Sequence, residues 1–312
     1  MALDPIVMFF IAGFAISLMK VEFKLPSAIY EFLSIILLLA IGLKGGIELS
    51  KQNVGDLVGD IGLVLIMGIL IPIIAYPILH FLGKFNRVDS SAIAAHYGSV
   101  SVGTYAVGVA FLDNISVSYE PYLPLYLVVL EIPAIVVGII LAKGITKDTN
   151  WKEVARESFL AKSIVLLFVG LLIGWAAGVK AEESLAPFFF DPFKGVLALF
   201  LLEMGVVAAS QVGLLKKYGL FLLVFGVTFP VISAGIGLGF AVLMGLSLGG
   251  ALLLMVLAAS ASYIAVPAAV RIALPEANPG LSLTASLGIT FPFNVIIGIP
   301  LYYAMAQTYL GG

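Results

Sequence analysis

Long apolar runs, separated by charged residues or by Gly, Pro and Asn, divide this chain into ten segments. A membrane-spanning helix needs about 20 mostly apolar residues, and fewer when it is buried inside a bundle. The pattern therefore predicts an all-α membrane protein with ten transmembrane helices. The predicted spans are Ile6–Met19, Ile29–Leu43, Ile61–Leu82, Ser90–Leu112, Tyr122–Ala142, Ile164–Val179, Val196–Ala209, Leu220–Leu246, Leu248–Leu274 and Leu281–Leu310.

Composition supports the same interpretation. Of the 312 residues, 62% are hydrophobic and 11% are charged, and the mean hydropathy is +1.16. A soluble domain carries about a quarter charged residues. The 16 basic and 18 acidic residues give a net charge of −2, so no basic field favours nucleic acid. The chain has no cysteine, which excludes disulfides, thiolate metal sites and a cysteine nucleophile. A soluble enzyme is therefore excluded.

The basic residues are distributed unevenly between the loops. With the N-terminus placed outside, 12 basic residues fall on the inside and 4 on the outside. The inside set is Lys20, Lys24, Lys84, Arg87, Lys143, Lys147, Lys152, Arg156, Lys162, Lys216, Lys217 and Arg271, and the outside set is Lys44, Lys51, Lys180 and Lys194. The positive-inside rule then predicts a multi-pass protein of the plasma (inner) membrane with both termini outside.

Similar segments recur at a nearly constant spacing. Ile6–Gly13 resembles Ile164–Leu171, and Gly68–Ile74 resembles Gly226–Ile232, both at an offset of 158 residues (164 − 6 and 226 − 68). Five spans per half, an odd number, would insert the second copy upside down, which is typical of secondary transporters. The predicted organisation is a first inverted repeat at 1–145, a cytoplasmic linker at 146–157 and a second repeat at 158–312. The alternative is a receptor or structural membrane protein with accidental similarity.

The fourth and ninth spans contain residues that interrupt helices. The fourth reads AHYGSVSVGT over residues 95–104, and the ninth reads AASASYIAVP over residues 258–267, where Pro267 removes a backbone donor. Two interrupted helices that cross would bring half-helix N-termini to one point. Their free N–H groups suit a small anion, and nearby carbonyl and serine oxygens suit sodium. The alternative is that small residues here only allow close helix packing.

Carboxylates inside predicted spans are functional candidates, because a charge is costly at membrane depth. Glu131 is the strongest, since the equivalent part of the tenth span offers Thr290 and Asn294. The alternative is a protonated Glu131 that makes one helix–helix hydrogen bond. Glu31 is expected at the interface, and Glu203 has no assigned role.

Enzyme functions find little support in the sequence. His96 and Ser99 are three residues apart, as in a serine–histidine membrane protease, but the predicted interruption between them disturbs that geometry. We expect His96 to be a packing residue, with proton transfer as the alternative. The chain has no His-Glu-x-x-His zinc motif, P-loop or dinucleotide fingerprint.

Several stretches carry a resemblance that covers nearly the whole chain. The most specific are Ala259–Ser262, Ile272–Pro279, Gly298–Leu301 and Ala306–Thr308, and Pro121–Tyr122, Glu131–Ala134 and Asp191–Pro192 also match. In these stretches the chain is similar to the sodium-dependent bicarbonate transporter family, known from cyanobacterial carbon uptake. The resemblance implies a homotrimer of ten-helix, inverted-repeat subunits with broken, crossing helices 4 and 9. It implies sodium-coupled symport of bicarbonate by elevator-like alternating access, with sodium as coupling ion and no covalent cofactor. Regulation by a trimeric PII-like protein on the cytoplasmic side is also implied.

The family's anion site maps onto the crossing of the fourth and ninth spans. The implied substrate-binding residues are Gly98, Ser99, Ser101, Gly103, Thr104, Ser260, Ser262 and Tyr263. Cyanobacterial members carry an acidic residue where this chain has Tyr263, and Asp where it has Glu131. Glu131, with Thr290 and Asn294, is then the predicted sodium site. The competing functions are a symporter of another small anion and a proton-coupled antiporter using Glu131.

Overall fold

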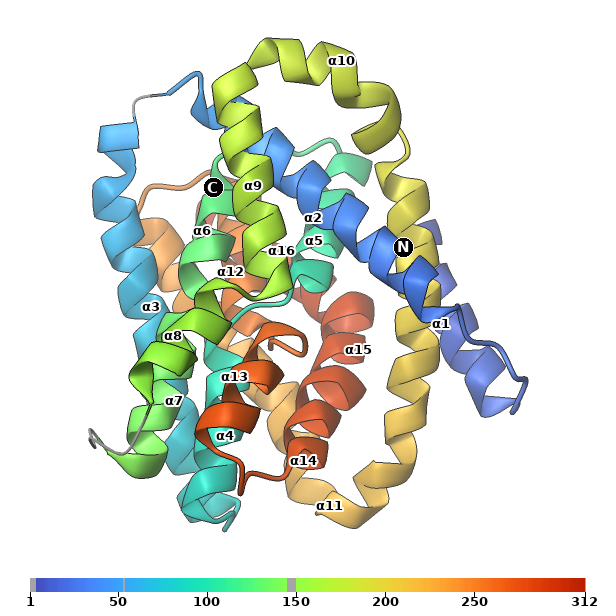
Figure 1. The fold of residues 1–312 in the computed structure, drawn as a ribbon, viewed down its shortest axis with the longest axis vertical. Coiled ribbons are helices and arrows are strands. Elements are labelled where there is room, and N and C mark those ends of the chain that lie inside the picture. Colours follow the sequence, from blue (N-terminus) through green and yellow to red (C-terminus); the bar gives the residue numbers. More distant parts are fainter. Residues whose placement is uncertain (1–3, 53, 145–149, 312) are drawn as a thin grey trace.

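The computed structural model of the protein describes residues 4–311 except 53 and 145–149 (Figure 1). Within these ranges every regular element is a helix, so the all-α prediction is confirmed. Two sequence predictions fall outside the described residues, namely Lys147 and the first part of the linker predicted at 146–157.

Sixteen α-helices and four short 3-10 or π-helical segments follow one another along the described chain. They are α1 (Pro5–Leu18), α2 (Ser27–Leu49), η1 (Val54–Leu57), α3 (Val58–Pro77), η2 (Ile78–Leu82), α4 (Arg87–Gly98), α5 (Val102–Asn114), α6 (Leu123–Leu130), α7 (Pro133–Lys143), α8 (Trp151–Phe159), α9 (Lys162–Ala177), α10 (Val179–Phe189), α11 (Phe193–Leu243), α12 (Leu248–Ala259), α13 (Ala265–Ala273), α14 (Pro279–Leu283), η3 (Thr284–Thr290), α15 (Phe291–Phe293), η4 (Asn294–Gly298) and α16 (Ile299–Leu310). α11 is kinked at Gly219, whose φ of 83° favours glycine.

Each of the ten predicted spans coincides with helix, but the helices differ in length. Among the described residues six helices are long and apolar enough to cross a membrane, or seven if α8 and α9, bent by 54°, form one span. The six are Ser27–Leu49, Val58–Leu82, Leu123–Lys143, Phe193–Leu214, Tyr218–Leu243 and Pro279–Leu310. The other predicted spans consist of the short α1 and of two interrupted helices, α4–α5 and α12–α13. Length and composition therefore indicate a multi-pass protein, and the ten-span topology stays a prediction.

Helices α1 and α11 pack so closely that their backbones touch. A Cβ atom built on Gly13 of α1 would overlap the carbonyl oxygen of Leu202 in α11. Conversely, a Cβ atom on Gly205 of α11 would overlap the carbonyl oxygen of Phe10 in α1. Small residues at such contacts are the usual basis of tight packing between membrane helices.

Helices α2 and α9 repeat this arrangement with their own glycines, and they run side by side in Figure 1. A Cβ atom on Gly42 of α2 would overlap the carbonyl oxygen of Leu167 in α9. One on Gly170 of α9 would lie 3.0 Å from the carbonyl oxygen of Leu39 in α2. The two tight pairs are thus built from reciprocal glycine contacts.

The interrupted helices occupy the interior. Residues 89–98 of α4 are buried without exception, and so are residues 249–259 of α12. A helix buried on all sides is expected to be apolar all round. α12 satisfies that expectation, whereas α4 carries Asp89, two serines and His96. The polar groups of α4 therefore need partners inside the protein.

Carboxylates hold the N-terminal ends of both interior helices. Asp89 in the first turn of α4 accepts a hydrogen bond from the backbone N–H of Asn278 at 2.7 Å. Glu120, in the loop before α6, accepts one from the N–H of Ser247, the N-cap of α12, at 2.6 Å. A negative charge near a helix N-terminus is stabilising because it faces free N–H groups and the positive end of the dipole.

The described part of the predicted linker forms α8, which docks on α13. Val154 of α8 is buried in one apolar cluster with Val266, Ala269 and Val270 of α13. The connection between the predicted halves therefore packs directly on the second half of an interrupted helix.

Candidate functional site

Both serine-containing spans are interrupted at the serines themselves. α4 ends at Gly98, Ser99 has an extended backbone, and Ser101 caps α5 by accepting the N–H of Thr104 on its Oγ at 3.2 Å. Serine is a favoured N-cap because its hydroxyl satisfies a free N–H of the first turn. The local sequence therefore ends one helix and begins the next within three residues.

The second interruption has the same construction. α12 ends at Ala259, and Ser260 has an extended backbone with its Oγ donating to the carbonyl of Leu257 at 2.9 Å. Ser262 Oγ accepts the N–H of Val266 in the first turn of α13 at 3.4 Å. Ser101 is thus the N-cap of α5, whereas Ser262 lies two residues before Ile264, the N-cap of α13, and reaches the first turn only through this longer hydrogen bond.

The two interruptions lie against each other in the centre of the molecule. The N–H of Ser101 donates to Ser260 Oγ at 3.0 Å, and the N–H of Ser262 donates to the carbonyl of His96 at 2.8 Å. All four predicted serines are at most 3% exposed. The structure therefore brings Ser99, Ser101, Ser260 and Ser262 together, and it employs their hydroxyls largely in holding the backbone.

The predicted glycines Gly98 and Gly103 lie where neighbouring atoms leave no room for a side chain. A Cβ atom on Gly98 would come within 2.7 Å of the Ala134 Cβ, and one on Gly103 within 2.6 Å of the Tyr263 hydroxyl oxygen. Thr104 donates from Oγ1 to Ser101 Oγ at 2.9 Å. Close packing is therefore one role of these residues, whatever ligand the site holds.

Glu131 lies beside the first interruption, between α6 and α7. Its side chain is 2% exposed, and its Oε2 accepts a hydrogen bond from Ser99 Oγ at 3.0 Å. Pro133, two residues later, has no N–H and so cannot continue the helical hydrogen bonds, which explains the irregular backbone at Glu131. The carboxylate reaches the substrate-site residues through Ser99.

Thr290 and Asn294 belong to two other hydrogen-bonded groups. Thr290 Oγ1 shares a 2.7 Å hydrogen bond with the hydroxyl of Tyr97. Asn294 Nδ2 donates to the carbonyl of Ala259, the last residue of α12, at 2.9 Å. Asn294 therefore holds the second interruption much as Glu131 holds the first, and each of the three predicted sodium ligands has its own protein partner.

His96 and Glu203 are buried polar groups with different surroundings. His96 Nδ1 lies 2.7 Å from the carbonyl of Ala92 and therefore carries the proton, while Nε2 has no partner among the described residues. Glu203 Oε2 accepts the N–H of Leu25 at 2.9 Å, so it satisfies the chain just before α2. The sequence left the role of Glu203 open because Leu25 lies 178 residues away.

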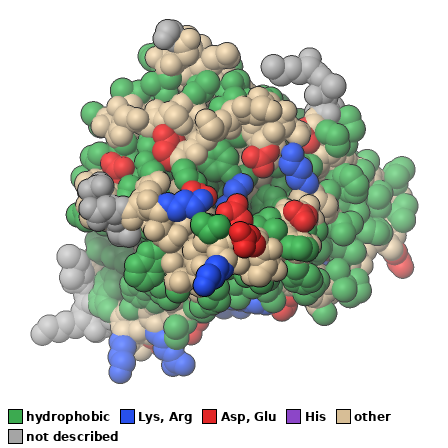
Figure 2. Space-filling view, turned by 90° about the horizontal axis from the view of Figure 1, so that it is seen from above, with side chains coloured by type: hydrophobic (Ala, Val, Ile, Leu, Met, Phe, Trp, Pro, Cys, Tyr) green, Lys and Arg blue, Asp and Glu red, His purple; other side chains and the backbone are tan. Residues whose placement is uncertain are grey.

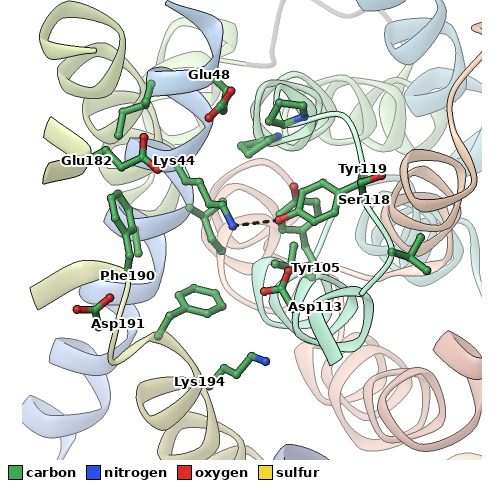
Figure 3. Close-up of a pocket in the computed structure, with 18 residues that line it drawn as sticks. Lys44, Glu48, Tyr105, Asp113, Ser118, Tyr119, Glu182, Phe190, Asp191 and Lys194 are labelled. Atoms are coloured by element: carbon green, nitrogen blue, oxygen red, sulfur yellow. Dashed lines mark hydrogen bonds between the residues drawn. The ribbon is translucent and has the colours of Figure 1, made fainter. Parts of the chain in front are cut away.

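One cavity, which we call the Lys44 cavity, opens between α2, α5, α10 and the loop before α6. Its volume is about 540 Å³, and Lys44 projects into it toward the hydroxyl of Tyr119 at 3.4 Å (Figure 3). Burial raises the pKa of the Tyr119 hydroxyl, so this group stays protonated. Charged side chains also gather near the middle of the face seen from the α10 end (Figure 2). The deepest polar group of the cavity is Tyr105.

A second cavity, the Lys162 cavity, lies between α2, α5 and α11 and has a volume of about 480 Å³. Its lining includes residues 102–103 and 263–264, which belong to the two interruptions. The ion pair between Lys162 Nζ and Glu31 Oε2, 2.9 Å long, is also part of its wall. Neither cavity was visible in the sequence, because the residues that line them come from distant segments.

Apolar helices and buried polar groups at helix interruptions define a multi-pass membrane protein with a polar interior. The family model of the Na+-dependent bicarbonate transporter superfamily matches residues 5–307 of the chain. The protein therefore belongs to this superfamily, and the predicted resemblance is confirmed. Membership makes it a transport protein and not an enzyme. A comparison with curated proteins gives no match.

Proposed function

We propose that the protein is a sodium-coupled symporter that carries bicarbonate across the plasma membrane, with its anion site where the two interruptions meet. The observation that carries this proposal is that α5 and α13 both begin at the crossing, with a serine hydroxyl bonded to an N–H of each first turn. The first N–H groups of a helix have no intrahelical partner and lie at the positive end of the dipole. Two such ends beside each other favour a small anion.

Bicarbonate fits the donors at this point. The first-turn N–H groups of Val102 and Gly103 are available to oxyanion oxygens, because the Ser101 cap serves Thr104. The serine hydroxyls remain close enough to reorient toward a ligand. The family membership supplies the identity of the anion.

Inverted repeats are part of the proposal, and reciprocal contacts support them. Gly13 of α1 and Gly170 of α9 are 157 residues apart (170 − 13), while Gly42 of α2 and Gly205 of α11 are 163 apart (205 − 42). Gly13 and Gly170 contact the carbonyls of Leu202 and Leu39, which are 163 residues apart (202 − 39). Gly42 and Gly205 contact the carbonyls of Leu167 and Phe10, which are 157 apart (167 − 10). The α1–α11 and α2–α9 pairs are therefore related as two copies of one unit would be, with halves at 1–145 and 158–312.

We assign the coupling ion to Glu131. Hard cations prefer carboxylate, carbonyl and hydroxyl oxygens, and Glu131 and Ser99 supply two of these types at the first interruption. A cation bound there also balances the charge of the anion. Thr290 Oγ1 is already bonded to the Tyr97 hydroxyl and the Gly226 carbonyl. Asn294 Oδ1, the oxygen that could bind a cation, accepts from the Tyr302 hydroxyl at 2.7 Å. These two oxygens complete the predicted set only if their present hydrogen bonds rearrange.

A proton-coupled transporter is the second candidate. Its support is the burial of Glu131 with a neutral hydroxyl as its hydrogen-bond partner, since an unpaired carboxylate in an apolar interior is expensive. Uptake of labelled bicarbonate into proteoliposomes separates the two. Sodium coupling requires loss of uptake when potassium replaces sodium, whereas proton coupling requires uptake that ignores sodium and follows a pH gradient.

Glu131→Gln tests the assignment of the ion. The amide keeps the size and one carbonyl oxygen but removes the charge. We expect a large increase in the sodium concentration that gives half-maximal uptake, with unchanged protein level. Glu183→Gln, on the exposed α10, is the matched control. Normal sodium dependence with reduced thermal stability would assign Glu131 a structural role instead.

Elevator-like alternating access, a homotrimer and a PII-like regulatory partner are proposed from the family resemblance. Both termini are proposed to lie outside, and contacts at the chain ends support this. Asp4 accepts a hydrogen bond from Asn114, whose Oδ1 also accepts from Lys194 at 3.3 Å. Tyr303 near the C-terminus packs against Phe111 of α5. Both ends therefore contact the C-terminal part of α5, which also lines the Lys44 cavity.

A further inference from the structure

The two cavities approach α5 from different sides and end at different residues of its first turns. The Lys162 cavity reaches Val102 and Gly103, whereas the Lys44 cavity ends at Tyr105. The proposed anion site lies next to Val102 and Gly103. In this structure the site is therefore approached through the Lys162 cavity, and one turn of α5 separates it from the other.

Tyr263 lies between the Lys162 cavity and the start of α5. Its hydroxyl oxygen would be 2.6 Å from a Cβ atom on Gly103, and its ring packs edge-on against Phe291 with centroids 5.4 Å apart. The hydroxyl is near Ser101 but has no hydrogen bond within the described residues. A buried hydroxyl without a partner is costly, so a ligand that accepts from it gains the free energy otherwise lost.

Tyr105 has the corresponding place on the opposite side. Its side chain is 1% exposed and lies in the wall of the Lys44 cavity (Figure 3). Its hydroxyl likewise has no partner among the described residues. Each route to the first turn of α5 therefore ends at a tyrosine with an unused donor.

We propose that Tyr263 and Tyr105 are the two closures of the anion site, and that the Tyr263 hydroxyl donates a hydrogen bond to a small oxyanion bound at the start of α5. The ring of Tyr263 partly covers the site on the side of the Lys162 cavity, which still reaches Val102 and Gly103, and the ring of Tyr105 closes the site toward the Lys44 cavity. The identity of the oxyanion as bicarbonate rests on the proposed function, whereas the positions of the two closures do not.

Single cysteines test the closures without a transport assay, because the chain has none of its own. Val102→Cys in oriented proteoliposomes is exposed to a membrane-impermeant thiol reagent from one side at a time. Lys162→Cys and Lys194→Cys identify the two sides. We expect slow modification of Val102→Cys from the Lys162 side and none from the Lys194 side.

Removing a ring should then open its own side. Tyr263→Ala should speed modification from the Lys162 side several-fold, and Tyr105→Ala should allow modification from the Lys194 side. Ile264→Cys, which is 44% exposed and lines the Lys162 cavity, should react at the same rate with and without Tyr263→Ala. Equal access of Val102→Cys from both sides, or unchanged rates in the alanine variants, would overturn the closures.

Tyr263→Phe isolates the hydroxyl, since it keeps the ring. Bicarbonate should slow modification of Val102→Cys in the parent protein, and Tyr263→Phe should need roughly 3- to 10-fold more bicarbonate for the same protection. Tyr30→Phe is the matched control, because Tyr30 lines the same cavity and its hydroxyl contacts Met204 Sδ. Equal protection in Tyr263→Phe and the parent would disprove the hydroxyl contact. Effects of the alanine variants without any bicarbonate protection would keep the closures and refute bicarbonate as the ligand.

Discussion

At the scale of single residues, the serines of the crossing act first on the backbone. Ser101 caps α5, Ser262 accepts an N–H from the first turn of α13, and Ser260 links one interruption to the other through its hydroxyl. A serine that caps a helix at the proposed anion site would affect affinity indirectly, because its loss also loosens the N–H groups that we propose bind the anion. Their mutation should therefore change stability and affinity together.

Ser101→Ala should show this double effect. It removes the acceptor of the Thr104 N–H and the partner of the Thr104 hydroxyl, and loss of a cap costs about 1 kcal/mol. We expect a lower melting temperature and a several-fold higher bicarbonate concentration for half-maximal uptake. Ser184→Ala on α10, whose hydroxyl bonds only within its own exposed helix, should change neither. A change in affinity with no change in melting would instead indicate direct binding alone.

At the scale of helices, the closest helix–helix contacts occur where glycines allow two backbones to touch. A Cβ atom on Gly13, Gly42, Gly170 or Gly205 would meet a carbonyl group of the partner helix, whereas one on Gly235 of α11 would have no atom within 4 Å. Helix propensity treats all of these glycines alike, and it favours alanine at each by about 1 kcal/mol. Whether a Gly→Ala substitution stabilises or destabilises the protein therefore depends on the atoms that the new Cβ atom would contact.

Gly46→Ala and Gly235→Ala test this difference. A Cβ atom on Gly46 would overlap the carbonyl oxygen of Leu171 in α9, so we expect a loss of roughly 1–3 kcal/mol from forced separation of α2 and α9. Gly235→Ala should leave the protein as stable or slightly more stable. Thermal melting of the purified variants in one detergent gives the comparison. Equal melting temperatures would show that α2 and α9 are less tightly packed than described.

Carboxylates at helix ends also act at this scale. Glu120 accepts both the N–H and the hydroxyl of Ser247 at the start of α12. Glu120→Gln keeps an acceptor but removes the negative charge that faces the helix dipole. We expect thermal melting to show a loss of about 0.5–2 kcal/mol in stability. This loss should be smaller at high salt, because salt screens the interaction of the charge with the helix dipole. Glu183→Gln, which is exposed and lies beyond the first turn of α10, is the control. An unchanged melting temperature in Glu120→Gln would exclude a contribution of its charge.

At the scale of the whole molecule, the charge distribution and the chain ends favour one orientation. The Lys44 cavity, Lys194 and Asp4 lie on one side, and the Lys162–Glu31 pair belongs to the other cavity. Positive charge in the predicted inside loops, 12 basic residues against 4, predicts that the second side faces the cytoplasm.

Topology can be measured directly. A tag at either terminus should be accessible on intact cells, and a tag between residues 150 and 151 only after permeabilisation. Termini on opposite sides of the membrane would contradict the even number of spans and, with it, the inverted repeats, whereas two cytoplasmic termini would contradict the orientation predicted from charge.

The sequence by itself determined the class of the protein and the positions of its interruptions. Hydropathy and clusters of glycine and serine are local properties, so the all-α membrane architecture and the approximate ends of α4 and α12 were readable from residue order. Pro267 does not mark the second interruption, because it lies within α13. Only the tertiary structure decided which distant groups meet. Glu131 bonds to Ser99, Thr290 to Tyr97 across 193 positions, and Tyr263 covers Gly103. These pairings depend on how ten apolar segments pack, and apolar segments of similar composition carry little information about their neighbours, because apolar attraction has no direction.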